Sequence, residues 1–576
     1  MKHKNAISKK KPSRSMLLAA TLAPAAVLGS GGAMAGMVFE DDPFIPGHWV
    51  TSGYVREQIS LNLRDRPGTF FDDQFHVSMI RTTVRIDLDG EIGPLRIGLV
   101  GRVAREAETP WLRRLDEGTY QGTAINALGQ GANDGQAEPN FLKGQLEEEE
   151  MREFFVEFDV GDRFVVKLGR QQVVWGETDF FQAMDILHGR DLRWRLFFEP
   201  ENEEWRKPLI LANVIMQVPE LDGSLQVVVR PGLDRQRDIG SSVDFYGGRW
   251  QPNPFDAIDF FQAGILPFNY THHTGNFHTP TGAVRWAGTL PEWTNYTGYS
   301  VAFIRSHLSG APISSSVQGF KGEGPLSVAN GGLGALGQAI YPVINNYAMS
   351  LNYDLSDAGF NGTLAAEVVW TPKRPFNRGF SGNAQGIANL TAQGGLAAAF
   401  AGAFGSAGHG LSPIEKNQLL WMLRLESTGV RLQDYIGTGR PSFLSVQLFD
   451  RWLTDFRATD ELLDTAGWNA ASSEHTFVLT IVLLTNYNFD LINPGIAWGT
   501  DLTHGGGFFL PWVEFIWGDY WRLRAEADLF YAPHSPSPNN IPVSAGGNPN
   551  ELGNGGHSFG LFEDQDQFVL RLTRQF

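Results

Sequence analysis

The sequence contains no cysteine among its 576 residues. Disulfide bonds, cysteine-ligated zinc and thiol catalysis are therefore excluded. Beyond the N-terminal region, no segment offers about 18 consecutive apolar residues, so no transmembrane helix is predicted. Acidic residues outnumber basic ones by 63 to 46, and charged residues make up only 19% of the chain. A net negative charge repels phosphates, which argues against nucleic acid as a partner.

The N-terminus has the pattern of an export signal. Its first 35 residues hold six basic and no acidic residues, then an apolar run over 16–28, and end in the small-x-small sequence Ala33-Met34-Ala35. We predict that residues 1–35 form a removable signal peptide. A membrane-anchoring helix is the alternative, but the apolar run is too short to span a bilayer. Removal leaves 40 basic residues against 63 acidic ones, a net charge of −23.

Aromatic residues are abundant, at 12% of the chain, with 40 Phe and 16 Trp. An exported chain rich in aromatics and free of cysteine fits a transmembrane β-barrel, in which aromatic girdles lie at both membrane interfaces. A large secreted β-protein would fit less well.

The last nine residues, Phe568 to Phe576, largely alternate between apolar and polar. One face carries Phe568, Leu570, Leu572 and Phe576. This pattern resembles the closing strand of bacterial outer-membrane β-barrels, in which the terminal residues are also the signal read by the barrel-assembly machinery. In a soluble sandwich it would be an ordinary half-buried strand.

Residues 521–531 alternate in the same way. Trp521, Leu523, Ala525, Ala527, Leu529 and Tyr531 face one way, and Arg522, Arg524, Glu526 and Asp528 face the other. Four charges on one face need water or partners, so we predict that these four line a wet lumen. Similar alternation occurs around Ile80, Leu95, Phe154 and Leu419, and a strand is expected over 163–175. Other strands are expected to start near Trp49, Leu209, Leu225, Val284, Tyr299, Tyr347, Thr363, Leu444, Phe477, Ile496 and Phe508.

The connections between these strands alternate between short and long. Turns are expected at 89–91, 161–162 and 518–519, and long loops at 63–73, 107–150 and 532–563. Outer-membrane barrels have short periplasmic turns and long external loops. At roughly 60–70 residues for each hairpin, residues 36–576 form a single barrel domain of about 16 strands, within a range of about 14–18.

The most unusual stretch runs from Gly169 to Pro208. It contains Gly169-Arg170-Gln171-Gln172-Val173-Val174-Trp175-Gly176-Glu177, followed by Arg190-Asp191-Leu192 and by Glu203-Glu204-Trp205-Arg206-Lys207-Pro208. It resembles the Gly-Arg-Gln-x-Val-x-Trp-Gly-Glu signature of a proteobacterial outer-membrane family of unknown function, number 1302 in the domain-of-unknown-function series. Where that family has Asn-Pro before an Asp, this chain has Gly189-Arg190-Asp191. The resemblance implies a whole-chain barrel, a resistance-nodulation-division (RND-type) inner-membrane exporter and a periplasmic lipoprotein-like protein as partners, and traffic of lipids or other hydrophobic compounds. It implies no catalytic residues.

Segment 176–208 has apolar residues at roughly helical spacing, interleaved with charges. We predict a helical excursion that folds into the lumen as a constriction, where opposed charges would select solutes. The alternative is a structural plug whose charges pair with those of the wall. The candidate contacts are Trp175, Glu177, Asp179, Phe180, Phe181, Asp185, Arg190, Asp191, Arg193 and Arg195.

Other features point to weaker alternatives. Gly/Ala-rich stretches at 328–340 and 386–410 could transfer a hydrophobic ligand between the lumen and the membrane, or simply pack together as a lid. The acidic run 147–150 could bind divalent cations or be a solvated loop end. No metal-ligand spacing and no Gly-x-Ser-x-Gly elbow occurs. If the chain were instead a hydrolase, the candidate rim histidines would be His188, His475, His504 and His534.

These patterns predict an all-β, antiparallel transmembrane barrel in the outer membrane of a Gram-negative bacterium, in contact with outer-membrane lipid. The predicted function is a pore or conduit for hydrophobic or amphipathic molecules, without cofactor or metal. The alternatives are a general polar-solute porin, an outer-membrane hydrolase and a structural barrel.

Overall fold

The computed structural model describes most of the chain outside the N-terminal 37 residues and several long connections. The described residues are 38–42, 45–65, 72–114, 146–176, 178, 181, 183–195, 198–199, 201–230, 240–241, 268–269, 280–291, 297–308, 313–314, 338–340, 342–356, 359–376, 414–460, 462, 472–532, 559 and 562–576. The signal peptide predicted at 1–35, the stretch 386–410 and His534 lie outside them.

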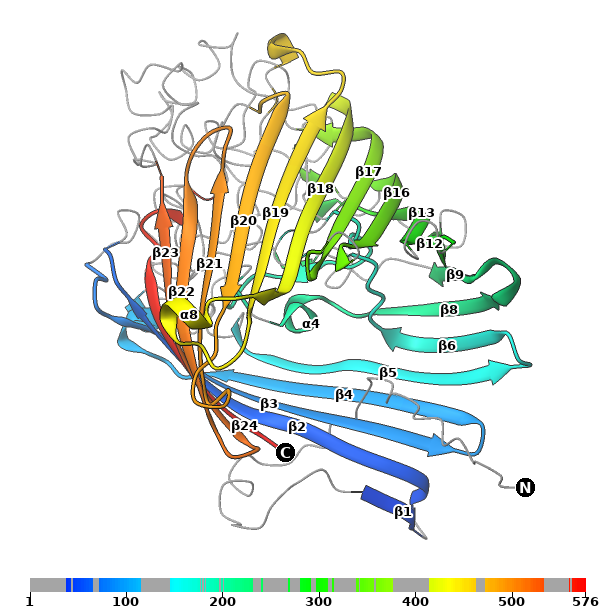
Figure 1. Cartoon of the computed structure of the whole chain (residues 1–576), viewed down its shortest axis with the longest axis horizontal. Helices are drawn as coiled ribbons and strands as arrows, with labels where there is room; N and C mark the ends of the chain where they lie inside the picture. The colour runs from blue at the N-terminus through cyan, green and yellow to red at the C-terminus, as the bar shows by residue number, and fades with distance from the viewer. Residues whose placement is uncertain are drawn as a thin grey trace, which may run out of the picture.

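Eighteen antiparallel strands close into one barrel, and strand β1 (Val38–Asp42) pairs beside them with β2 (Figure 1). The ring is closed by β2 (Ile45–Asn62) and β24 (Gln567–Gln575), which pair from Tyr54↔Gln575 to Asn62↔Gln567. The first half of the ring continues with β3 (Val77–Ile92), β4 (Leu95–Glu106), β5 (Glu148–Val160), β6 (Phe164–Gln171), β8 (Leu209–Val218), β9 (Gly223–Arg230), β12 (Thr281–Thr289) and β13 (Gly298–His307). The second half consists of β16 (Val343–Asp354), β17 (Gly362–Phe376), β18 (Ile414–Val430), β19 (Ser442–Leu453), β20 (His475–Leu484), β21 (Ile492–Asp501), β22 (Gly507–Trp517) and β23 (Trp521–Tyr531), before β24.

Every strand expected from local alternation is present; the eighteen strands lie within the predicted range of about 14–18 but exceed the central estimate of about 16. That estimate divided the chain length by a mean hairpin length. The mean fails here because connection lengths vary widely. The link between β21 and β22 has only residues 502–506, whereas the link between β4 and β5 has residues 107–147.

The turns at 161–163 and 518–520 confirm two of the three predicted short turns. The third prediction is wrong, because residues 89–91 lie inside β3 and the chain turns at Gly93-Pro94. Gly93 has φ 57° in this tight turn, a left-handed conformation that glycine adopts at low cost. The strand predicted over 163–175 ends earlier, at Gln171.

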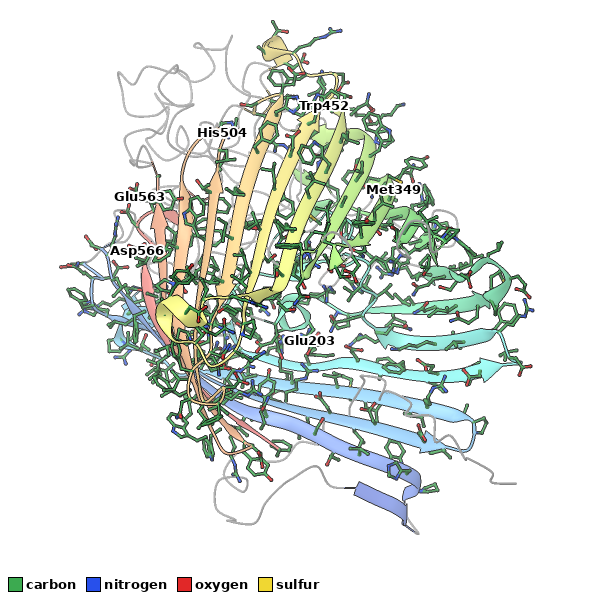
Figure 2. The ribbon with its side chains drawn as sticks, viewed as in Figure 1. Glu203, Met349, Trp452, His504, Glu563 and Asp566 are labelled. Carbon is green, nitrogen blue, oxygen red and sulfur yellow. The ribbon has the colours of Figure 1, made fainter. Side chains whose placement is uncertain are left out.

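Side chains alternate between an apolar exterior and a mixed interior. On β23, Glu526 and Asp528 are buried inside while Trp521 and Tyr531 are exposed outside, as predicted. On β24, Phe568 and Leu572 are exposed, whereas Val569, Arg571 and Thr573 are buried. Met349 on β16 is another exposed apolar side chain of the exterior (Figure 2). The buried clusters therefore lie within the barrel.

Candidate functional site in the barrel lumen

Residues 172–208, here called the lumen segment, connect β6 to β8 and cross the interior of the barrel. Their two ends start side by side, because Gln171 pairs with Leu209. The backbone N–H of Met184 donates to Glu367 of β17 at 2.8 Å, while Glu204 lies 2.9 Å from Arg85 of β3. Strands β3 and β17 lie on opposite sides of the closed ring. The lumen segment therefore reaches both walls.

The described part of the lumen segment is mostly irregular, and its only α-helix is the four-residue α4 (Asn202–Trp205), seen among the strands in Figure 1. The predicted excursion into the lumen is present, but its predicted helical conformation is wrong for the described residues. Several of its backbone groups are satisfied by long-range partners instead: Met184 donates to Glu367, and Lys207 donates to the Gly189 carbonyl at 2.9 Å. Irregular backbone is tolerated at membrane depth where protein partners surround it.

The N-terminal half of the lumen segment packs on an apolar stretch of wall. Trp175, Met184 and Leu187 belong to one buried cluster with wall residues of β8 to β19. The wall residues of that cluster are Leu209, Leu211, Val228, Ala283, Ala302, Ile304, Ala348, Val369, Met422 and Phe449. Phe181 meets Phe449 with ring centroids 6.0 Å apart and Phe559 at 5.5 Å. Trp175 also donates from its indole N–H to Gln226 at 2.8 Å.

The C-terminal end of the lumen segment carries carboxylates that meet an arginine-rich wall. Glu204 lies 2.9 Å from Arg102 on β4 and accepts a hydrogen bond from the Tyr54 hydroxyl at 2.7 Å. Glu199 lies 3.3 Å from Arg56 on β2, and Glu201 lies 3.1 Å from Arg571 on β24. Burial alone raises the pKa of Glu204, but Arg102, Arg85 and Arg56 outweigh it and hold that pKa well below its usual range. Glu204 is therefore an ionised anchor.

Within the lumen segment, two ion pairs join its two halves. Asp185 lies 2.5 Å from Arg206, and Asp191 lies 2.7 Å from Lys207. Burial raises the pKa of Asp185, yet the nearby guanidinium groups of Arg206 and Arg190 bring it below its ordinary value. Asp191 behaves in the same way, because Arg193 and Lys207 overcome its burial and its pKa falls well below the usual range.

His188 ties the two ends of the lumen segment together. Its Nε2 accepts the backbone N–H of Val173 at 2.9 Å, and its Nδ1 lies 2.9 Å from the carbonyl oxygen of Lys207. The first bond needs a lone pair on Nε2, so Nδ1 carries the proton and the imidazole is neutral. Burial lowers the pKa of His188 to about 4.

Arg195 fixes the middle of the lumen segment to the predicted charged wall. Its guanidinium pairs with Glu526 and lies 3.1 Å from Asp528, and all three side chains are buried. Glu526 also pairs with Arg524 of the same strand. The fourth predicted wall residue, Arg522, donates to Gln575 at 3.1 Å.

The described candidates from the sequence thus gather in one place: Trp175, Phe181, Asp185, Arg190, Asp191, Arg193 and Arg195 all contact one another or the wall around them. Glu177, Asp179 and Phe180 lie outside the described residues. The charges of this region are paired with each other and with the wall. This geometry agrees with the structural-plug alternative, in which charges pair with those of the wall. It differs from a constriction in which two rows of opposite charge face each other across an open gap.

Sequence reasoning missed the wall arginines as partners of this segment. Arg81, Arg85 and Arg102 were recognisable as inward-facing because they alternate with apolar residues along β3 and β4. Their partners were not recognisable, because Glu199 and Glu204 lie about 100 positions away. The acidic run 147–150 also differs from a solvated loop end: Glu148 lies 3.0 Å from Arg102, and Glu150 lies 3.2 Å from Arg152.

The described residues hold neither a metal-binding cluster nor a membrane-spanning helix. Across them, no group of His, Asp and Glu side chains could hold a metal ion. No helix in the same part of the chain is long and apolar enough to cross a membrane.

A closed antiparallel barrel has no free strand edges, and its backbone groups are satisfied within the wall. An apolar exterior around a charged interior is the arrangement that a bilayer requires of such a barrel. The described strands therefore form a closed β-barrel with the two faces of a membrane-spanning barrel.

Comparison with protein-family models finds no match, and comparison with curated proteins finds none either. The barrel is similar to solved structures of low identity. One is OccK9 (OpdG) of Pseudomonas aeruginosa, with 10% identity, TM-score 0.41, and coverage of 92% of this chain and 97% of that one. Another is a BenF-like porin from Pseudomonas fluorescens Pf-5, with 8% identity, TM-score 0.40 and coverage of 92% and 98%. A third is Salmonella typhi OmpF in complex with daunomycin, with 10% identity, TM-score 0.37 and coverage of 94% and 100%.

Proposed function

We propose that this barrel is an outer-membrane channel for amphipathic molecules, and that the lumen segment limits passage through it. The observation that carries the proposal is the two-sided lumen wall. Arginines gather on β24 and β2 to β5, whereas two buried apolar clusters lie on β8 to β19 and on β20 to β23, beside the charges of β23. A solute with an apolar body and an anionic group would meet a matching surface on each side.

The basic side is built from strands that are neighbours in the ring. Its buried arginines are Arg56, Arg81, Arg102, Arg152 and Arg571. They are held by carboxylates of the lumen segment and of β5, including Glu204 and Glu148. An anionic solute group could exchange with one of these carboxylates at modest net cost, because the arginine would remain paired.

The apolar side consists of two buried clusters on the opposite wall, interrupted by buried polar side chains such as Glu367 on β17 and Gln447 on β19. Beyond the cluster that holds Trp175, a second buried cluster contains Val482, Ala497, Phe508, Leu510 and Phe530 of β20 to β23. Phe198 of the lumen segment packs on it, with ring centroids 5.4 Å from Phe508 and 5.2 Å from Phe530. Such a surface favours a solute that carries apolar area, since burial of that area is stabilising.

The test is conductance of the purified protein in planar bilayers, with and without the lumen segment. A short Gly-Ser linker can replace residues 172–208, because Gln171 and Leu209 are already paired neighbours. We expect low conductance from the wild type and a several-fold increase from the linker variant. The matched control is Glu220→Gln, which breaks the exposed pair with Arg163 at a short turn. Equal conductance of the wild type and the linker variant would contradict the proposal that the lumen segment limits passage.

The cargo is tested separately. A medium-chain fatty acid anion should reduce the ion current through the linker variant more strongly than a polar anion of similar size, such as gluconate. Equal competition would favour a general polar-solute porin. Coupling to an RND-type exporter and to a periplasmic lipoprotein-like protein remains a prediction from the family resemblance.

A further inference from the structure

Three side chains from two adjacent hairpins meet at the end of the barrel that carries the long connections. Ser473 lies just before β20, Asp501 is the last residue of β21, and His504 lies in the short 502–506 connection to β22. Strands β20 and β21 are paired, with Val478 opposite Asp501. Figure 2 shows His504 at this end of its strands.

The distances among these three side chains are those of a nucleophile, a base and an orienting acid. Ser473 Oγ lies 2.9 Å from His504 Nε2, and His504 Nδ1 lies 3.0 Å from Asp501 Oδ2. Both separations fall in the hydrogen-bonding range that such a relay needs. The Asp501 side chain is fully buried, whereas that of His504 is 10% exposed.

The hydrogen bonds of Asp501 determine the imidazole tautomer. Its Oδ1 accepts the backbone N–H groups of Thr503 and His504, each at 2.9 Å, so the carboxylate is held in place by the turn. A carboxylate accepts only, so His504 Nδ1 must carry the proton that it donates to Oδ2. Nε2 is then left with the lone pair that accepts the Ser473 hydroxyl proton.

The other described histidine candidates lack this arrangement, and His188 lies buried in the lumen segment rather than at the predicted rim. Both ring nitrogens of His188 are engaged with backbone groups. His475 bonds Asp450 at 2.8 Å, but its ring is stacked against Trp452 and Phe477. Among the described candidates, His504 alone has a serine on one ring nitrogen and an aspartate on the other.

We propose that Ser473, His504 and Asp501 form a hydrolytic site for carboxylic esters, a function separate from the channel. Ser473 Oγ attacks the ester carbonyl carbon while its proton passes to His504 Nε2. The carbon–oxygen bond to the alcohol breaks, and the departing alcohol takes that proton. Water then attacks the acyl-serine through the same histidine, which releases the acid and restores the serine. Asp501 is a positioning residue that holds the imidazole.

The surroundings favour esters with an apolar acyl chain. Leu502, which joins Asp501 to the histidine loop, is 56% exposed. The stacked rings of Trp452, His475 and Phe477 lie at the start of the neighbouring β19–β20 pairing, with Trp452 opposite His475. Aromatic rings at barrel ends mark the membrane interface. An amphipathic ester in the outer leaflet would therefore present its carbonyl near Ser473.

The test uses the full-length barrel in detergent with an alkyl fluorophosphonate and with p-nitrophenyl esters of short and long acyl chains. We expect the probe to attach to Ser473, as located by peptide mass spectrometry. Ser473→Ala and His504→Ala should each reduce ester hydrolysis by at least roughly 10²-fold, the lower range for loss of acid–base catalysis. Long-chain esters should be hydrolysed faster than short-chain ones.

The chain offers two matched controls. Ser472→Ala removes the neighbouring hydroxyl, which accepts a hydrogen bond from Arg451, and His48→Ala removes a histidine of β2. Both should keep labelling and hydrolysis, and heat-modifiable gel mobility verifies that each variant is folded. Absence of labelling in folded wild type, or labelling that persists in Ser473→Ala, would overturn the proposal and leave these residues a turn-stabilising cluster. Because the assay measures no ion flow, its outcome is independent of the channel proposal.

Discussion

The guanidinium of Arg102 and the carboxylate of Glu204 lie 2.9 Å apart, and both side chains are buried although 102 positions separate them in the chain. This pair joins α4 of the lumen segment to the wall strand β4. The wall arginine is also held by Glu148 at 3.0 Å. A plug attached in this way should be sensitive to the loss of one carboxylate.

Glu204→Gln should loosen the lumen segment and raise conductance. Breaking a buried ion pair costs roughly 3–5 kcal/mol. We expect about 2–3 kcal/mol in urea unfolding here, because Glu148 still neutralises Arg102. Glu203→Gln is the matched control, since the neighbouring Glu203 side chain is 50% exposed and its pair with Arg85 should contribute less than about 1 kcal/mol. Similar effects of the two changes would contradict the anchoring role of Glu204.

His188 should make the lumen segment sensitive to acid. Its pKa is about 4 in the folded protein, below the ordinary value of about 6.5. The unfolded segment therefore binds more protons between these values, so stability falls as pH drops from about 6.5 to about 4 and then changes no further through this group. The loss should be about 3 kcal/mol. Asp185, Arg206 and Arg190 are the charged groups that act on this imidazole.

His188→Gln can accept from Val173 and donate to Lys207 without titrating, so the pH dependence in that range should disappear. Limited proteolysis of the lumen segment at pH values from about 4 to about 7 measures this pH dependence, because the window spans the two pKa values of His188. His475→Gln is the control. Unchanged pH dependence in His188→Gln would assign the effect to other groups.

Arg195→Met should be the most destabilising single change in the lumen segment. It leaves Glu526 and Asp528 buried beside each other without the guanidinium that they share. We expect a loss of roughly 3–5 kcal/mol in urea unfolding. The combination of Arg195→Met with Glu526→Gln and Asp528→Asn removes the uncompensated charge and should recover most of that loss. Failure of the combination to recover stability would show that packing, not charge, explains the defect.

Asp450 breaks the alternation of β19, because it lies on the outward face opposite the buried Phe449. Its Oδ2 accepts the Trp421 indole N–H at 3.0 Å and lies 2.8 Å from His475 Nδ1. Asp450→Ala should cost about 1–3 kcal/mol, since both partners lose their acceptor. A double-mutant cycle with Trp421→Phe in urea unfolding would measure the coupling, and additive effects would mean that this hydrogen bond contributes nothing.

The sequence by itself determined the strands and their two faces. Alternation is a local property with a period of two residues, so Arg524, Glu526 and Leu529 could be assigned to their sides from β23 alone. The end of β6 and the turn at Gly93 were misplaced by a few residues, because local periodicity does not indicate where pairing stops. The estimate of about 16 strands from chain length was too low, since it depends on connection lengths that follow no period.

Only the tertiary structure determined the path of the lumen segment and its contacts with the wall. The helix-like spacing in 176–208 gave way to an irregular path, because the wall supplies partners such as Glu367 and Arg102 that an isolated helix would not need. The approach of Ser473 to His504 likewise depends on the pairing of β20 with β21. Such contacts join residues tens to hundreds of positions apart, and their geometry exists only once the barrel has closed.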